Sequence, residues 1–159
     1  MRRRLVLLWV LLWVLLCGAG SAADDGPPLF TANRANGRAW RTWNISTKAI
    51  YLRALLDGMQ ILISVLPLQK LSEADVKVAE VRTQVGHMTA SEVVEAIDKV
   101  YTPENLAIPI WRVYLIVADR VNGMAEELVQ LEIAMTRNEA NEAISREEAA
   151  KSSQGKDGK

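Results

Sequence analysis

Residues 44–66 constrain the fold more than any other part of this sequence, because they are apolar around most of a helical circumference. Asn44 or Ser46 can cap the start of a helix there, and Pro67 ends it. The polar residues that interrupt two adjacent apolar stripes fall on one narrow line: Arg53, Asp57, Gln60 and Ser64. A helix with so little polar surface is predicted to lie at the centre of the domain, with the other segments packed around it.

A membrane span is the alternative interpretation of these residues. On an insertion scale, Arg53 and Asp57 near the middle would together cost about 5 to 7 kcal/mol, and the Leu, Ile and Val side chains return only about 3 to 5 kcal/mol. The central helix of an aqueous domain is therefore preferred.

Gly58 in the middle of this helix costs about 1 kcal/mol relative to Ala, so another backbone or a Trp ring is expected to pack against it.

The N-terminal residues 1–23 are expected to be a secretory signal peptide. Three arginines at positions 2–4 precede an unbroken apolar run over residues 5–16, and small residues follow up to Ala23. The apolar run is too short to cross the hydrocarbon layer as a helix, so cleavage after Ala23 is the preferred interpretation. The pattern predicts a periplasmic or secreted protein that meets a membrane only through an uncleaved signal.

Charge and cysteine content exclude several classes of function. The chain has 19 basic and 19 acidic residues and a formal net charge of +0, so it offers no basic surface for nucleic acid. Its one cysteine, Cys17, lies in the predicted signal, which leaves no disulfide, thiol nucleophile or cysteine metal site afterwards. His87 is the only histidine, so no site with two histidine ligands can form. We therefore expect no metal, no cofactor and a core held together by burial alone.

Beyond the signal, the chain is predicted to form a single compact all-α domain of four or five helices. Residues 24–35 are rich in Gly and Pro and are expected to be an extended leader. The helical domain then spans residues 36–150, and residues 151–159 are expected to be a disordered tail. The structure of residues 68–88 stays open, although a capping signal at Ser72 favours a short helix there.

Two helices in the second half of the chain have clear starting signals. Thr89 and Glu92 form a capping box that predicts a helix over residues 90–101. Pro109 suits the first position of a helix, and residues 110–121 continue from it with almost only apolar side chains. Their β-branched content would also suit a buried strand, but length and the helical continuation favour a helix.

Residues 125–150 are rich in Glu, Ala, Leu and Arg and predict a long C-terminal helix. A stripe of apolar residues at heptad-like spacing begins just before this helix and continues into it: Val121, Met124, Leu128, Leu131 and Met135. This stripe either packs on the protein's own core or forms the seam of a homodimer. It ends after Met135, so its length does not establish a coiled coil.

Two short motifs go beyond composition. The first comprises Asn36, Gly37, Trp40, Lys48, Tyr51, Asp57 and Gly58, and the second comprises Glu92, Asp98, Tyr101, Asn105, Ile108, Pro109 and Ile110. Together they resemble an uncharacterised group of small exported bacterial helical proteins over about residues 36–123. More distantly they resemble the immunity proteins that protect bacteria from type VI secretion amidases, which are usually held by disulfides. The resemblance implies an all-helical, non-enzymatic exported domain from a bacterium.

The polar line on the first long helix is the best candidate for a binding pocket, with further polar residues supplied by the later helix and turn. The candidate residues are Arg53, Asp57, Gln60, Asp98, Tyr101 and Asn105. The alternative is that the line is a partly exposed edge of the domain. Asp57 and Asp98 would act as an acid and base pair only if burial raised the pKa of one of them.

No further nucleophile or metal ligand in the sequence supports catalysis by these two carboxylates. We therefore expect a domain that binds an unknown protein or small ligand and is not an enzyme. The alternative within the same class is an immunity-type inhibitor that occupies the cleft of a secreted cell-wall hydrolase.

Overall fold

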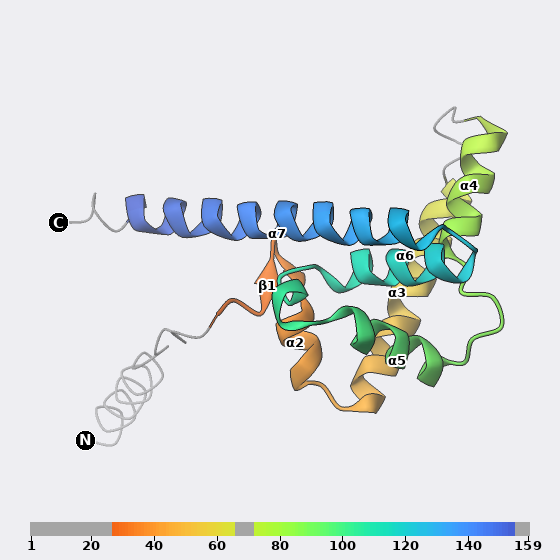
Figure 1. The fold of residues 1–159 in the computed structure, drawn as a ribbon, viewed down its shortest axis with the longest axis horizontal. Coiled ribbons are helices and arrows are strands. Elements are labelled where there is room, and N and C mark those ends of the chain that lie inside the picture. Colours follow the sequence, from red (N-terminus) through yellow and green to blue (C-terminus); the bar gives the residue numbers. More distant parts are fainter. Residues whose placement is uncertain (1–26, 66–71, 155–159) are drawn as a thin grey trace, which may run out of the picture.

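The computed structural model describes residues 27–65 and 72–154 of the chain, and within them the protein forms six α-helices, one 3-10 turn and one small hairpin (Figure 1). The elements are β1 (Phe30–Thr31), β2 (Arg34–Ala35), α2 (Gly37–Thr42), α3 (Ile45–Val65), α4 (Glu73–Thr83), α5 (Ala90–Val100), η2 (Pro103–Asn105), α6 (Ile110–Val121) and α7 (Glu126–Gln154). The all-α fold class and the long C-terminal helix are confirmed, with one helix more than the upper expectation of five. The predicted signal peptide and the predicted stop at Pro67 lie outside the described residues.

Helix starts follow the capping signals of the sequence. The Asn44 side chain accepts a hydrogen bond from the Thr47 amide at 2.9 Å, and α3 begins beside it. Ser72 caps α4, and Thr89 forms the predicted capping box with Glu92 at the start of α5. These caps supply hydrogen-bond partners for amide groups that the first helical turn leaves free. Because a cap and its partner are only a few residues apart, the helix starts could be predicted from the local sequence.

The two ends of the domain differ from the sequence-based expectation. Residues 30–35, predicted as part of an extended leader, form an antiparallel hairpin in which Phe30 pairs with Ala35. Thr31 is buried there, and its hydroxyl donates a hydrogen bond to the Ala107 carbonyl at 2.7 Å. At the other end, α7 continues to Gln154 and therefore includes residues 151–154 of the predicted tail.

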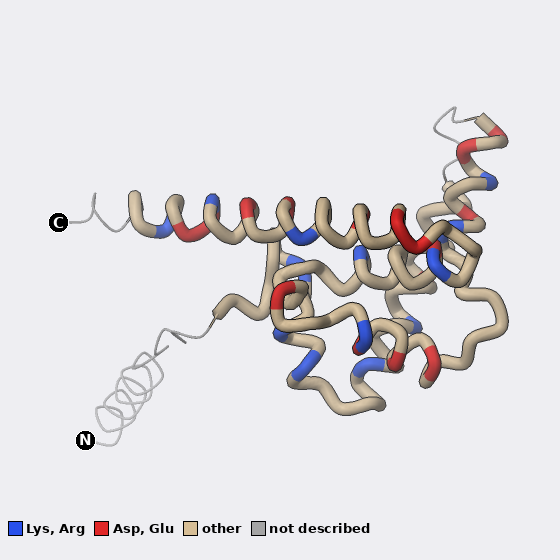
Figure 2. The backbone as a smooth tube through the Cα atoms, in the orientation of Figure 1, with Lys and Arg blue, Asp and Glu red and all other residues tan. Residues whose placement is uncertain are grey.

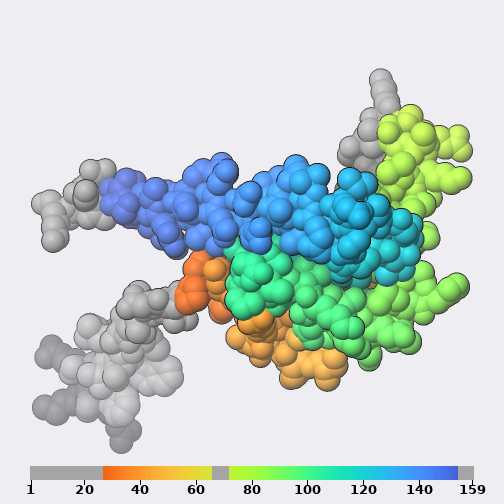
Figure 3. All heavy atoms as spheres, in the orientation of Figure 1, coloured from red at the N-terminus to blue at the C-terminus, as the bar shows by residue number. Residues whose placement is uncertain are grey.

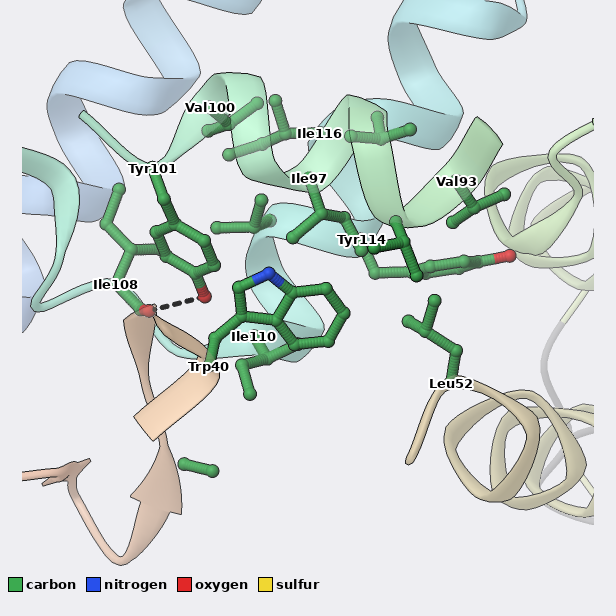
Figure 4. Packing of buried hydrophobic residues seen from close by; sticks show 14 of the residues in the cluster. Trp40, Leu52, Val93, Ile97, Val100, Tyr101, Ile108, Ile110, Tyr114 and Ile116 are labelled. Carbon is green, nitrogen blue, oxygen red and sulfur yellow. Dashed lines mark hydrogen bonds between the residues drawn. The ribbon is translucent and has the colours of Figure 1, made fainter. Parts of the chain in front are cut away.

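The hydrophobic core is centred on α6. Seven of its residues are buried: Ile110, Val113, Tyr114, Ile116, Val117, Ala118 and Asp119. Helices α4, α5 and α7 all pack against it. Figure 4 shows the Trp40 indole of α2 among side chains from α5 and α6, with Tyr114 and Leu52 beside it.

The prediction that residues 49–66 form the centre of the domain is wrong. Along α3, all of whose residues are described, only Leu52 is buried. The helix packs against α5 and α4 on one side, and Ile50 and Ile61 on the other side are 71% and 68% exposed. Apolar residues around most of the circumference therefore did not make this helix central, because its place depends on which other helices compete for the same core.

Helix α7 packs on the core with a different face from the one expected. Val129, Ile133, Thr136 and Ala140 are buried, whereas Leu128, Leu131 and Met135 of the predicted stripe are exposed. In the space-filling view α7 lies across the body as a ridge, and its C-terminal part extends beyond the other helices (Figure 3). Acidic residues outnumber basic ones along it (Figure 2).

An ion-pair cluster joins α4, α6 and α7. The Arg82 guanidinium donates to Asp119 from Nε at 3.0 Å and also pairs with Glu132 at 3.2 Å. The Asp119 side chain is only 5% exposed, so Arg82 supplies the charge that makes its burial tolerable.

No helix within the described ranges has the length and apolar character needed to cross a membrane.

Candidate functional site

A groove of about 790 Å³ lies between α3 and α4 and reaches the Tyr114 ring of α6. Its lining comprises Arg53, Leu56, Asp57, Met59, Gln60 and Ile63 from α3, Glu80 and Thr83 from α4, Gln84, Val85 and Gly86 after it, and Tyr114. Three of the six candidate residues, Arg53, Asp57 and Gln60, therefore line one groove. The polar line on α3 is an exposed edge, and it is also one wall of this groove.

The α3 wall combines a polar rim with an apolar floor. Arg53 and Asp57 lie one helical turn apart and form an ion pair, with 3.4 Å from Nε to Oδ1. Their side chains are 81% and 62% exposed, so the pair is solvated and either member can exchange its partner for a ligand. Below them, Leu56 and Met59 pack against the core and give the groove a fixed apolar floor.

The α4 wall is held in place by Tyr114 of α6 and by Asn122, which follows that helix. The Tyr114 hydroxyl donates to the Thr83 carbonyl at 2.6 Å. The Asn122 amide donates to the carbonyls of Val81 and Gln84, both at 3.0 Å. These bonds fix the C-terminal end of α4 at a set distance from the α3 rim. Burial raises the pKa of Tyr114 to about 12, so the bond-donating neutral form persists over the whole physiological range.

Asp98 belongs to a different cluster. Its Oδ1 accepts a hydrogen bond from the Trp40 indole at 2.6 Å and pairs with the Lys48 ammonium at 2.8 Å. The Lys48 ammonium also lies over the Trp40 ring, 4.9 Å from its centre. Asp98 is not among the residues that line the groove, so the structure does not unite it with Asp57 in one site. Its contacts connect α2, α3 and α5.

Tyr101 and Asn105 are buried and hold the backbone between α5 and α6. The Tyr101 hydroxyl donates to the Ile108 carbonyl at 3.0 Å (Figure 4). Burial, and to a smaller extent the charge of Tyr51, raises the pKa of Tyr101 well above 10.0. The Asn105 amide donates to the Val100 carbonyl at 2.9 Å. Neither residue lines the groove, and Asn105 lines a separate, smaller pocket of about 190 Å³.

Most residues of the two sequence motifs have structural roles of this kind. Asn36 caps α2, and its amide donates to the Thr31 hydroxyl at 3.1 Å. A Cβ at Gly37 would overlap the Tyr101 ring, which explains the glycine there. Asp57, which lines the groove, and Gly58 are exceptions: a Cβ at Gly58 would meet nothing within 4 Å in the described structure, so the predicted close packing against it is wrong.

The groove residues outside α3 were not found from the sequence. Glu80 and Thr83 are three positions apart and share one face of α4, and Gln84 follows at its C-terminal cap; the polar spacing was the available signal. It was not read because residues 68–88 could not be assigned. Across the described ranges, no three His, Cys, Asp or Glu side chains are grouped so as to hold a metal ion.

The chemistry of the groove is recognition by hydrogen bonds and apolar contact. It offers one guanidinium, two carboxylates and two primary amides around an apolar floor.

Comparisons with family models, with curated proteins and with solved structures found no match for this chain.

Proposed function

We infer that this protein is an exported, non-enzymatic binding domain that holds a segment of a partner protein in the groove between α3 and α4. The observation that carries the proposal is the arrangement of that groove, in which an exposed polar rim lies above a floor of Leu56, Met59 and Ile63. Its volume of about 790 Å³ falls within the range typical of ligand sites.

An extended peptide segment matches this chemistry better than a compact charged ligand. The rim carries opposite charges, Arg53 against Asp57 and Glu80, so no single ionic group is favoured. Gln60 and Gln84 each offer a donor and an acceptor, which is what a peptide backbone requires. Apolar side chains of the segment would contact Met59 and Ile63, and burying them supplies the affinity.

Export is supported by the order of basic, apolar and small residues over positions 1–23. The partner is accordingly expected outside the cytoplasm. Because Asp98 is bonded to Trp40 and Lys48, Asp57 is the one of the two candidate carboxylates that lines the groove. Pairing of Asp57 with Asp98 in one catalytic site therefore has no support from the geometry, and binding is the better account.

A capture experiment with two matched variants tests the proposal. Gln60→Arg places a bulky charge inside the groove, and Ser64→Arg places the same charge one turn further along α3, at an exposed residue outside the groove lining. Tagged wild-type and variant proteins are exported, purified with their partners and compared by quantitative mass spectrometry. We expect one protein to be retained by wild type and Ser64→Arg and to fall about tenfold or more with Gln60→Arg.

Equal retention of the same proteins by all three forms would contradict use of the groove. A hydrolase screen in which the purified protein shows turnover that Asp57→Asn abolishes would contradict the non-enzymatic assignment. If the captured partner is a cell-wall hydrolase that wild type inhibits and Gln60→Arg does not, the protein is an inhibitor of the immunity type.

A further inference from the structure

Helix α3 has a second apolar face, opposite to the one that packs on the core. Six residues at helical spacing form this outward face: Ile50, Ala54, Gly58, Ile61, Leu62 and Val65. All six are exposed, and Leu62 is 56% exposed. The groove wall lies to one side of this face and the core-packing side lies behind it. An exposed apolar face of this length on a helix is unusual for a monomer and indicates an interaction surface.

The smallest residues of the outward face lie between larger ones. Ala54 and Gly58, the two smallest, lie on either side of the level of Leu56, and larger residues lie beyond them in both directions. Small residues in the middle let two helix backbones approach closely, and large ones at the ends then pack beside them. In an antiparallel pair of α3 helices related by a two-fold axis at that level, Ala54 of one copy lies opposite Gly58 of the other.

We propose that the outward face of α3 is the interface of a homodimer in which two copies of this helix pack antiparallel. The solvated pair Arg53 and Asp57 flanks the face on one side. The two-fold axis brings Arg53 of one copy closer to Asp57 of the other than to the other copy's Arg53. The charges are therefore self-complementary, as an isologous interface requires.

The outward stripe of α7 is the competing surface for a dimer. It presents three large exposed side chains, Leu128, Leu131 and Met135, over about two helical turns. A stable dimer buries about 800 Å² on each partner, so a longer apolar face is favoured over a shorter one. The outward face of α3 runs along most of a 21-residue helix and is free of charged residues, so it comes closer to the required area.

One substitution at two equally exposed leucines separates the two surfaces. Leu62 of α3 and Leu131 of α7 are both 56% exposed, so Leu62→Lys and Leu131→Lys disturb each monomer alike. Sedimentation velocity over a concentration series measures the dimer in protein purified from cells that express the full chain. Because a two-fold interface contains each change twice, Leu62→Lys is expected to weaken dimerisation about 100-fold or more, and Leu131→Lys less than about threefold.

A wild-type protein that stays monomeric over this range would overturn the proposal, as would a dimer that only Leu131→Lys dissociates. The antiparallel register is tested in a Cys17→Ser background, so that introduced thiols are the only ones. Ala54→Cys mixed with Gly58→Cys is expected to form a disulfide-linked heterodimer in preference to either homodimer. Preferential Ala54→Cys homodimers would instead indicate a parallel pair. Gln60→Arg is expected to leave the dimer intact, so failure of the groove and failure of the interface are distinguishable.

Discussion

Helices α3 and α6 are both strongly apolar, yet one is enclosed by the protein and the other lies at its surface. Ile116 of α6 is buried, whereas Ile61 of α3 is 68% exposed. The difference is explained by neighbours, because α6 has α4, α5 and α7 around it and α3 has α5 and α4 on one side. Apolar content thus indicates that a helix needs partners, and it does not indicate whether the same chain supplies them all.

The polar residues of the two helices show the same difference. Arg112, Asp119 and Arg120 of α6 pair with residues of α7 and α4, at 3.3 Å for Arg112 with Glu139 and 2.7 Å for Arg120 with Glu126. On α3, Arg53 pairs with Asp57 of the same helix. The charges of the central helix are therefore matched by other elements. On α3, Lys48 near the N-terminal end is also matched by another element, through Asp98 of α5, whereas the exposed pair in the middle is matched locally.

The largest expected change in the free energy of unfolding comes from truncating one isoleucine in each helix and comparing the two variants. Ile116→Ala leaves a cavity in the core and is expected to lower the free energy of unfolding by about 3 kcal/mol. Ile61→Ala removes atoms that are already solvated, so its effect is expected within about 0.5 kcal/mol. Urea unfolding followed by circular dichroism, at a protein concentration where the chain is monomeric, measures both. A loss at Ile61→Ala as large as that at Ile116→Ala would show that α3 is more enclosed than described here.

The next effect compares the two arginine–aspartate pairs. Arg82→Met leaves Asp119, whose side chain is 5% exposed, without its cation and next to Glu132, so a loss of about 2 to 3 kcal/mol is expected. Arg53→Met breaks a solvated pair and is expected to cost less than about 0.5 kcal/mol. The same unfolding measurement applies, and the double variant Arg82→Met with Asp119→Leu is expected to recover much of the loss. Without such recovery, packing by the Arg82 stem would be the larger contribution.

Alkaline pH sharpens the comparison through the tyrosines of the two helices. Burial raises the pKa of Tyr114 from 10.0 to about 12, and it also raises the pKa of Tyr51. Because the folded state holds the phenol proton more tightly, this contribution to stability is complete below pH 10.0 and is lost as the pH rises through about 12. Unfolding followed along an alkaline titration is expected to show this decline, and Tyr114→Phe is expected to flatten it more than Tyr51→Phe. A Tyr114→Phe profile identical to wild type would contradict the assigned cause.

The smallest expected change in stability comes from replacing a glycine by alanine at two positions. Gly58→Ala adds a methyl group in open space on a helix and is expected to stabilise the monomer by about 0.5 to 1 kcal/mol. Gly37→Ala would force the Tyr101 ring to move, so it is expected to destabilise. Both are measured in the Leu62→Lys background, which separates folding from association. Destabilisation by Gly58→Ala there would show that the glycine has a neighbour within its own chain.

Half of the candidate site residues could be predicted to lie together from the sequence, because they are only a few positions apart on one helix. Arg53, Asp57 and Gln60 share one side of a helix through helical periodicity alone, and all three line the groove. Asp98, Tyr101 and Asn105 were selected for their residue types. Asp98 bonds to Trp40 and Lys48, which are far away in the chain, whereas Tyr101 and Asn105 bond to backbone carbonyls a few residues away. A polar residue near an apolar helix can line a site or support the fold, and its partners in the folded structure decide which.

By itself, the sequence determined where most helices begin and that the chain folds as an all-helical domain with a long final helix, because caps and apolar periodicity act over a few residues. The tertiary structure alone decided that α6 and not α3 is enclosed, that α7 packs with Val129 and Ile133 and not with Leu131, and that α4 completes the groove. Those outcomes depend on which apolar faces bury the most area together, and that is a property of the whole assembly of helices.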